Sequence, residues 1–309
     1  MGESREFPLV LHFKGGTLMH ILQRNKLAIL IGLIPALLIY LTFSIIPIGI
    51  SMYYSVMDWN GLGAMEFVGF QNFIDIANDP VFWTAVKNNI YVVVASVFGQ
   101  VPIALALALL LNRKLKGAKI FRIIGFMPVV ISTVVISLTW NMFYNSEIGF
   151  INRFLEAVGL GSLAQNWLGD PNWAMISVCV TIIWQFIGLY FIIFLAALQN
   201  VPGEVLEAAE IDGASGWKRT VFITIPMIWD TILIAVILCI SGSLRTFDLI
   251  YVMTNGGPAH STEVMAIYMY EKTFSSMKYG YGSAVSLYIF VFSLLLIWVS
   301  KLILQRKSK

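Results

Sequence analysis

The sequence predicts an all-α polytopic membrane protein with six transmembrane helices. Apolar residues make up 58% of its 309 residues and charged residues only 12%, about half the charged share of a soluble domain. So few charges cannot cover a water-exposed surface, and the apolar residues are gathered in long runs. A run of about 20 residues is long enough to cross the hydrocarbon core of a bilayer as a helix.

Five such runs contain no charged residue, and a sixth contains Arg245 and Asp248. In chain order the six runs are 27–54, 90–111, 123–144, 173–198, 231–253 and 281–300. The first run is too long for the apolar part of a signal peptide and lacks an evident cleavage site. We therefore expect it to be retained as a membrane anchor.

The placement of Lys and Arg predicts which side of the membrane each loop faces. With the N-terminus in the cytoplasm, fifteen of the 20 Lys and Arg residues fall in cytoplasmic segments and four in outer loops, while Arg245 lies inside a run. Because Lys and Arg concentrate on the cytoplasmic side, both termini are expected there. We divide the chain into a cytoplasmic segment (1–26), a transmembrane domain (27–304) with a cytoplasmic loop (199–228), and a cytoplasmic tail (305–309).

Several functions are excluded or disfavoured by what the sequence lacks. The net charge of +3 gives no nucleic-acid signal, and Cys179 and Cys239 lie inside apolar runs, where a disulfide framework is not expected. The three histidines form no metal-ligand pattern, and no catalytic set is evident. The chain also lacks the G-x-x-x-x-G-K-[ST] phosphate loop, so energy for any powered transport must come from another subunit.

The cytoplasmic loop 199–228 is predicted to contain a short helix. Pro202 suits the first turn of a helix, Glu204 and Glu207 favour the positive end of its dipole, and Gly213 offers a left-handed stop. Helical spacing of Val205, Ala208, Ala209 and Asp212 predicts one small, flat face for close docking. On pattern alone, an ordinary amphipathic helix remains an equal alternative, and simple solvation is the less favoured alternative for the glutamates.

Charged residues inside a span are costly and are functional candidates by default. Ser241, Arg245 and Asp248 are spaced i, i+4 and i+7, which predicts one helical face. Two interpretations stay open: Arg245 and Asp248 pair only to fix helix packing, or Arg245 hydrogen-bonds a solute.

The loop 199–228 resembles the EAA loop of ABC importer permeases. The resemblance rests on Glu207-Ala208-Ala209, on Asp212-Gly213-Ala214, and on Ile223-x-Ile225-Pro226. Ile225 replaces the usual Leu, and the aromatic residue near Thr220 and the second Pro near Asp230 are absent. Trp217 and the nearby Phe222 are expected to take over the packing.

A second segment resembles carbohydrate importer permeases, specifically the maltose-type first permease subunit. It runs from Phe247 to the Gly256-Gly257-Pro258 turn, with Thr262 shortly after. Together the two resemblances cover roughly residues 30–305. Extra spans and a large outer insertion found in the enterobacterial maltose subunit are absent here.

The resemblance implies a type I ABC importer permease fold in the inner membrane of a prokaryote. It implies a second homologous permease, two ATPase subunits that hold ATP and Mg, an extracytoplasmic sugar-binding protein and a sugar substrate, with no cofactor on this chain. The residues implied to couple to an ATPase are Glu204, Glu207, Ala208, Ala209, Asp212, Gly213 and Trp217.

The fourth and fifth runs are implied to line the substrate pathway. The residues are Trp184, Gln185, Tyr190, Ser241, Ser243, Arg245, Thr246 and Asp248, with Trp140, Asn141 and Tyr144 as weaker candidates. Trp184 and Tyr190 are expected to stack on a sugar ring, although an aromatic side chain in a span more often serves packing. Because the family's site residues are not closely reproduced, the sugar is expected to differ from maltose.

Two other classes of protein fit the sequence less well. An intramembrane enzyme needs an acid–base or metal cluster at the interface, and the sequence shows none. An ion-coupled secondary transporter is expected to show repeat symmetry and carboxylates within its spans. Here Asp248 is the only such carboxylate, and a cation lies beside it.

Overall fold

The computed structural model describes the backbone of residues 26–112 and 117–305, and the side chains of residues 32–112 and 117–302. Within these residues, four helices are long and apolar enough to cross a membrane: Gly32–Ser55, Pro80–Leu111, Pro171–Gln199 and Tyr279–Leu302. Two bent pairs of helices raise the number to six if each pair is one span. The predicted all-α polytopic fold is therefore confirmed. The predicted terminal segments lie almost wholly outside the described residues.

The chain divides into two compact units, of which the first ends at Tyr53. Its described part is helix α2 (Lys26–Tyr40), a π-helical turn η1 (Leu41–Ile45) and most of α3 (Ile46–Ser55). None of the residues in the apolar window of this span is buried. Such a helix needs lipid or another protein around it.

The second unit is built on two long helices that begin in the same way. These are α5 (Pro80–Leu111) and α9 (Pro171–Gln199), which pack along each other and against α13 (Trp229–Leu244). Asp79 and Asp170 each accept a hydrogen bond from the backbone N–H two residues later, at 2.8 Å, and a Pro follows in the first helical position. An Asp cap followed by Pro is a strong helix start.

Two predicted spans are broken rather than straight. The run 123–144 forms α6 (Ala118–Val130) and α7 (Thr133–Phe143), which meet at 98° because the backbone leaves the helical conformation at Ile131 and Ser132. At the other break, α11 (Gly216–Arg219), the π-helical turn η3 (Thr220–Thr224) and α12 (Ile225–Met227) meet α13 at 69°.

The predicted span 231–253 also ends early, at Leu244. Residues 245–247 are not helical, and α14 (Asp248–Thr254) begins a separate helix. The run Ser241-Gly242-Ser243 forms helix weakly, and the Thr246 hydroxyl donates to the Gly242 carbonyl at 3.2 Å. The prediction that Ser241, Arg245 and Asp248 share one helical face is therefore wrong.

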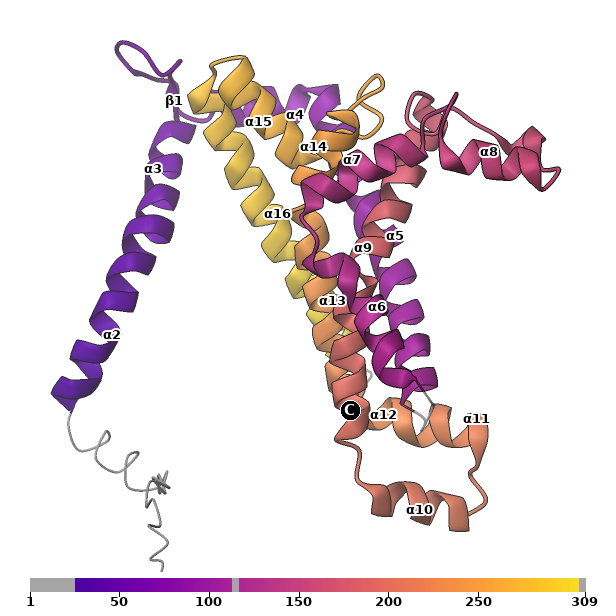
Figure 1. Ribbon diagram of the computed structural model, residues 1–309. Coiled ribbons are helices and arrows are strands. Elements are labelled where there is room, and N and C mark those ends of the chain that lie inside the picture. The colour runs from indigo at the N-terminus through magenta and orange to yellow at the C-terminus, as the bar shows by residue number, and fades with distance from the viewer. Residues whose placement is uncertain (1–25, 113–116, 306–309) are drawn as a thin grey trace, which may run out of the picture. The chain divides into compact units, whose positions relative to one another are not determined.

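Shorter elements gather at the two ends of the second unit (Figure 1). One end carries α10 (Gly203–Ile211) together with α11, η3 and α12. The other end carries an antiparallel pair of short strands and a set of short helices, followed by the start of the last long helix. These are β1 (Met57–Asp58), β2 (Glu66–Phe67), α4 (Gln71–Asn78), α8 (Phe150–Ala157), η2 (Gly161–Leu163), α14, α15 (Met265–Tyr270), η4 (Glu271–Ser275) and α16 (Tyr279–Gln305).

Candidate functional site

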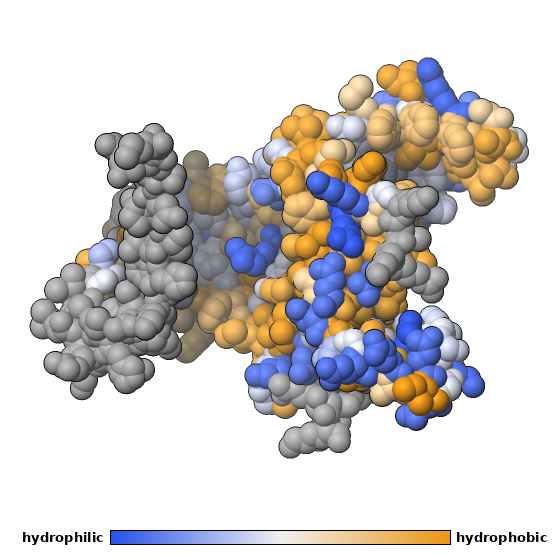
Figure 2. All heavy atoms as spheres, turned by 60° about the horizontal axis from the view of Figure 1, so that its bottom comes forward, coloured by the Kyte–Doolittle hydropathy of each residue, from blue (hydrophilic) through white to orange (hydrophobic). Residues whose placement is uncertain are grey.

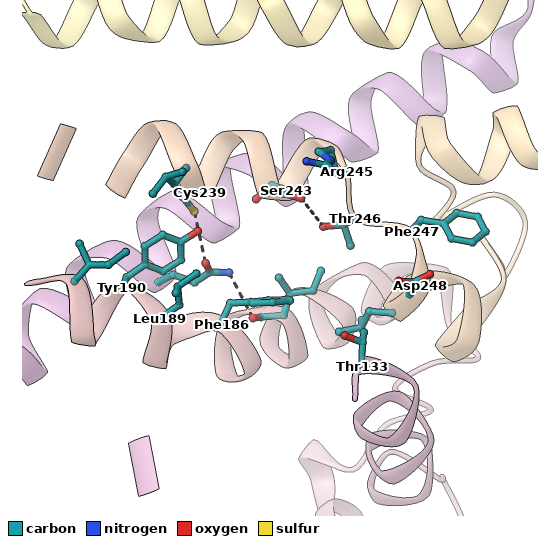
Figure 3. A pocket seen from close by; sticks show the side chains of 16 residues that line it. Thr133, Phe186, Leu189, Tyr190, Cys239, Ser243, Arg245, Thr246, Phe247 and Asp248 are labelled. Carbon is teal, nitrogen blue, oxygen red and sulfur yellow. Dashed lines mark hydrogen bonds between the residues drawn. The ribbon is translucent and has the colours of Figure 1, made fainter. Parts of the chain in front are cut away.

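A cavity of about 340 Å³ lies between α9, α13 and the break that follows α13 (Figure 3). Helix α9 contributes Phe186, Leu189 and Tyr190, while the break contributes Arg245 and Thr246. This volume is in the range of small-molecule sites, which are mostly apolar with a few polar groups. The break brings a cation, a hydroxyl and a carboxylate to the wall of an otherwise apolar cavity.

Five of the eight predicted pathway residues line this cavity. They are Tyr190, Ser243, Arg245, Thr246 and Asp248. Arg245 and Asp248 are both exposed, and no ion pair joins them in the described part of the chain. Arg245 and Asp248 therefore do not neutralise each other through a direct ion pair.

The other three predicted residues do not line the cavity. Gln185 is buried, and its Nε2 donates to the Thr133 hydroxyl at 3.1 Å, which connects α9 to the start of α7. Trp184 lies against Trp140, with ring centroids 5.5 Å apart, and lines a separate hollow. Ser241 lines neither of these two hollows.

Sequence reasoning missed several lining residues, of which Gln100 is the most informative. It is almost fully buried in α5; its Nε2 donates to the Ile182 carbonyl at 3.4 Å, and its Oε1 accepts from the Cys239 thiol at 3.6 Å. The sequence signal that could have identified Gln100 is its polar amide inside the uncharged run 90–111. Thr133 and Phe247 also line the cavity, but only the helix breaks bring them there.

At one end of the second unit, α10 ends in a well-formed cap. Gly213 has a φ of +80°, its N–H donates to the Glu210 carbonyl at 3.1 Å, and the Ala214 N–H donates to the Ala209 carbonyl at 2.8 Å. These are the two bonds of a Schellman motif, so the predicted Gly213 stop is confirmed. Pro202 is the N-cap just before the helix rather than part of its first turn.

The two sides of α10 differ from the prediction at one position. Glu204, Glu207, Ala208 and Asp212 are exposed, whereas Ala209 is buried. Ala209 turns inward because α10 packs back on α11 and η3. Ala209 is therefore not available for docking, although the sequence predicts it on the flat face.

Large apolar side chains lie exposed around this end of the chain. Ile211 is 87% exposed, Trp217 76% and Phe222 71%. Nearby, Arg219 pairs with Glu210 at 3.5 Å and ties α11 to α10. Figure 2 looks toward this end and shows mainly hydrophilic residues there, interrupted by a hydrophobic patch. Exposed side chains of this size indicate an interaction surface.

At the opposite end, the segment 254–263 is folded tightly. The Thr262 hydroxyl is 2.7 Å from the Thr254 hydroxyl and donates to the Gly257 carbonyl at 2.7 Å. Asn88 of α5 donates to the carbonyl of Glu263 at 2.9 Å. The Glu263 side chain is buried against His260, and burial raises the pKa of its carboxyl although His260 opposes the shift.

The fold, the cavity beside a broken span and the exposed surface at one end define a polytopic membrane protein with the parts of a transport subunit. Residues 100–309 match the family described as "Binding-protein-dependent transport system inner membrane component". The chain belongs to this family. It is thus an inner-membrane component of a transport system rather than an enzyme.

Relatives along nearly the whole chain support the same assignment. The chain is 35% identical over 277 residues to the probable ABC transporter permease protein YurN of Bacillus subtilis, covering 89% of this chain and 94% of the relative. It is 37% identical over 256 residues to the lactose transport system permease protein LacF of Rhizobium radiobacter, covering 82% and 85%.

A third relative is the trehalose/maltose transport system permease protein MalF of Thermococcus litoralis, which is 32% identical over 260 residues, covering 84% of this chain and 87% of the relative. Among solved structures, a chain of a bacterial ABC transporter involved in the import of the acidic polysaccharide alginate matches with a TM-score of 0.80 and 24% identity. The match covers 95% of this chain and all of that one. It shows the same fold.

Proposed function

We propose that the chain is one permease subunit of an ATP-driven, binding-protein-dependent importer of a sugar, most simply an oligosaccharide. The observation that carries the proposal is the capped helix α10 with Ile211, Trp217 and Phe222 exposed around it. Because the sequence has no phosphate loop of its own, this surface is where a separate ATPase would dock. The coupling residues are Glu204, Glu207, Ala208, Asp212, Gly213 and Trp217, while Ala209 supports the helix from within.

Two features make α10 suited to passing force. Its C-terminus is fixed by the two hydrogen bonds around Gly213, and Arg219 pairs with Glu210 across to α11. From α11, the chain continues through η3 and α12 into α13, which lines the cavity. A displacement of α10 by a closing ATPase pair would therefore move one wall of the cavity, as alternating access by rigid-body motion requires.

The chemistry of the cavity supports a sugar as the solute. Phe186 and Tyr190 present aromatic groups, while Ser243 and Thr246 present hydroxyls beside the charges of Arg245 and Asp248. Sugars combine apolar ring faces with many hydroxyl groups, so they use both kinds of contact. Three of the similar proteins are named for lactose, trehalose/maltose or alginate transport, which favours the same class here.

The remaining partners follow from this role. A second homologous permease completes the pathway, two ATPases hold ATP and Mg, and an extracytoplasmic binding protein delivers the sugar. The excess of Lys and Arg in the assigned cytoplasmic segments supports an orientation with both termini and α10 on the ATPase side.

Copurification tests the docking surface directly. The full chain is expressed with its candidate partner subunits, and Ile211→Asp is compared with Leu62→Asp. Leu62 is a similarly exposed residue, at 81%, in the loop between β1 and β2. We expect Ile211→Asp to lose the ATPase subunits and sugar-stimulated ATP hydrolysis, while Leu62→Asp keeps the ATPase subunits. Stoichiometric ATPase and normal uptake in Ile211→Asp would refute the proposal.

A further inference from the structure

Residues 145–168, between α7 and α9, form a projecting arm that carries α8. The arm is organised around Asn152, which is buried. Its Nδ2 donates to the carbonyls of Ser146 at 3.1 Å and Gln165 at 2.9 Å, while its Oδ1 accepts from the Trp167 indole N–H at 2.7 Å. A side chain bonded to both ends of the arm holds it as one body.

Helix α8 has an apolar side and a polar side. Phe150, Phe154 and Val158, spaced four residues apart, are 63%, 54% and 50% exposed. Glu156, about 160° around the helix from Phe154, is exposed on the opposite side, and Arg153 is exposed at the edge between the two sides. Residues four apart share a helical face, so Phe150, Phe154 and the C-cap residue Val158 form one exposed apolar stripe, with Glu156 on the other side.

The apolar side of the arm continues the apolar surface of the adjoining span. Phe143 of α7 contacts Phe150, with ring centroids 5.9 Å apart. A hollow of about 420 Å³ lies between α7, α8 and α9, lined by Phe143, Phe150, Trp184 and mostly apolar neighbours. On α7, Val135, Leu138 and Met142 are exposed as well. Helix α7 is the second half of the bent pair with α6, and the contact between Phe143 and Phe150 joins its exposed apolar surface to that of α8.

The direction of the arm matches a membrane surface. In Figure 1, α8 runs across the long axes of α5 and α9, at the end of the unit opposite α10. Figure 2, seen from the α10 side, shows mainly hydrophobic residues on the near side of the arm and hydrophilic residues at its far edge. The apolar side therefore faces back along the spans, toward hydrocarbon.

We propose that α8 is an interfacial anchor whose apolar side is seated in the outer leaflet of the bilayer. A helix with this division of residues lies in the plane of the interface, with its apolar face about 5–10 Å into the boundary between headgroups and acyl chains. The hollow beside Phe150 then takes an acyl chain. A soluble partner, by contrast, would approach from the water and meet the side that carries Glu156.

Spin labels at neighbouring positions test the anchor. Cys179 and Cys239 are buried, so an introduced cysteine is the accessible one on this chain, and the signal of the complex without it, which reports labelling of the copurified subunits, is subtracted. Phe154→Cys is compared with Glu156→Cys in vesicles of phosphatidylethanolamine and phosphatidylglycerol. Collision rates are measured with oxygen, which enters the bilayer, and with a nickel chelate, which stays in water.

We expect the label at position 154 to show a several-fold higher ratio of oxygen to nickel accessibility than the label at 156. Equal nickel accessibility at both positions would place the arm in water and overturn the proposal. Protection of position 154 from both reagents would mean that a protein covers this side, and would also overturn it. Val158→Cys and Arg153→Cys, about 140° apart around the helix, repeat the comparison if a first variant fails to fold.

Discussion

The contact between α9 and α6 at Gly188 gives a sharp test of how the cavity is built. A Cβ at Gly188 would lie 2.2 Å from the Gly125 carbonyl oxygen and 2.9 Å from the Phe126 Cα. Both are backbone atoms of α6, so no change of rotamer relieves the clash. In Gly188→Ala, the two helices must separate.

The size of the effect follows from these distances. Real Cβ atoms essentially never approach within 3.0 Å of such a neighbour, so α6 must retreat by roughly 1 Å. Overpacking costs about 1–3 kcal/mol, and we expect Gly188→Ala near the upper value, about 3 kcal/mol, because backbone must move. At about 2–4 °C per kcal/mol for a chain of this size, the midpoint of thermal unfolding should fall by roughly 6–12 °C.

The measurement is thermal unfolding of the purified complex in nanodiscs, combined with sugar uptake in vesicles. Uptake should fall in Gly188→Ala because α6 leads into α7, whose Thr133 lines the cavity and receives the Gln185 hydrogen bond. Gly242→Ala is the control for stability only, since nothing lies within 4 Å of a Cβ there. A Gly188→Ala complex with the midpoint and uptake of the unmodified protein would refute the reasoning.

Three further predictions concern the other parts of the chain. Gly213→Ala places a Cβ at φ +80° in open space, so it should cost only the left-handed backbone energy of about 1–2 kcal/mol but lower ATP-driven uptake; Gly203→Ala, also in open space and without a positive φ, should not, and equal uptake in both would contradict the cap's role. Burial raises the pKa of the Glu263 carboxyl above its ordinary 4.5, so the folded chain holds this proton more tightly than the unfolded chain. The free energy of unfolding should therefore fall as the pH rises from 4.5 through the pKa of the folded state. In Glu263→Gln the midpoint of thermal unfolding should depend less on pH over that interval, and an unchanged pH dependence would count against the buried carboxyl. Arg245→Met should raise the sugar concentration for half-maximal uptake by roughly tenfold or more, as loss of a hydrogen bond to a charged group of about 1.5–3 kcal/mol requires, and an unchanged value would exclude Arg245 from sugar contact.

The sequence by itself determined the features that depend on local pattern. A helix made of a long uncharged run such as 173–198 is stable only when lipid or protein surrounds it, so the runs themselves predicted the spans. The end of α10 was equally local, because Gly213 is the residue type that takes a left-handed φ at low cost. Family membership followed from short motifs in that same loop.

The tertiary structure decided which residues meet at the cavity. Gln185 and Trp184 are polar or aromatic residues in an apolar span, as Tyr190 is, yet they face Thr133 and Trp140 because the bend between α6 and α7 brings those residues to α9.

The break after Leu244 likewise depends on tertiary contacts, because a run of apolar residues does not show where its helix stops. It separates Ser241 from Asp248 and turns Arg245 and Thr246 to the cavity. Hydropathy is high wherever a span is removed from water, whether its side faces lipid or another helix, so it does not show which side faces a cavity. The lining of a cavity depends on the direction that each helix takes from its neighbours.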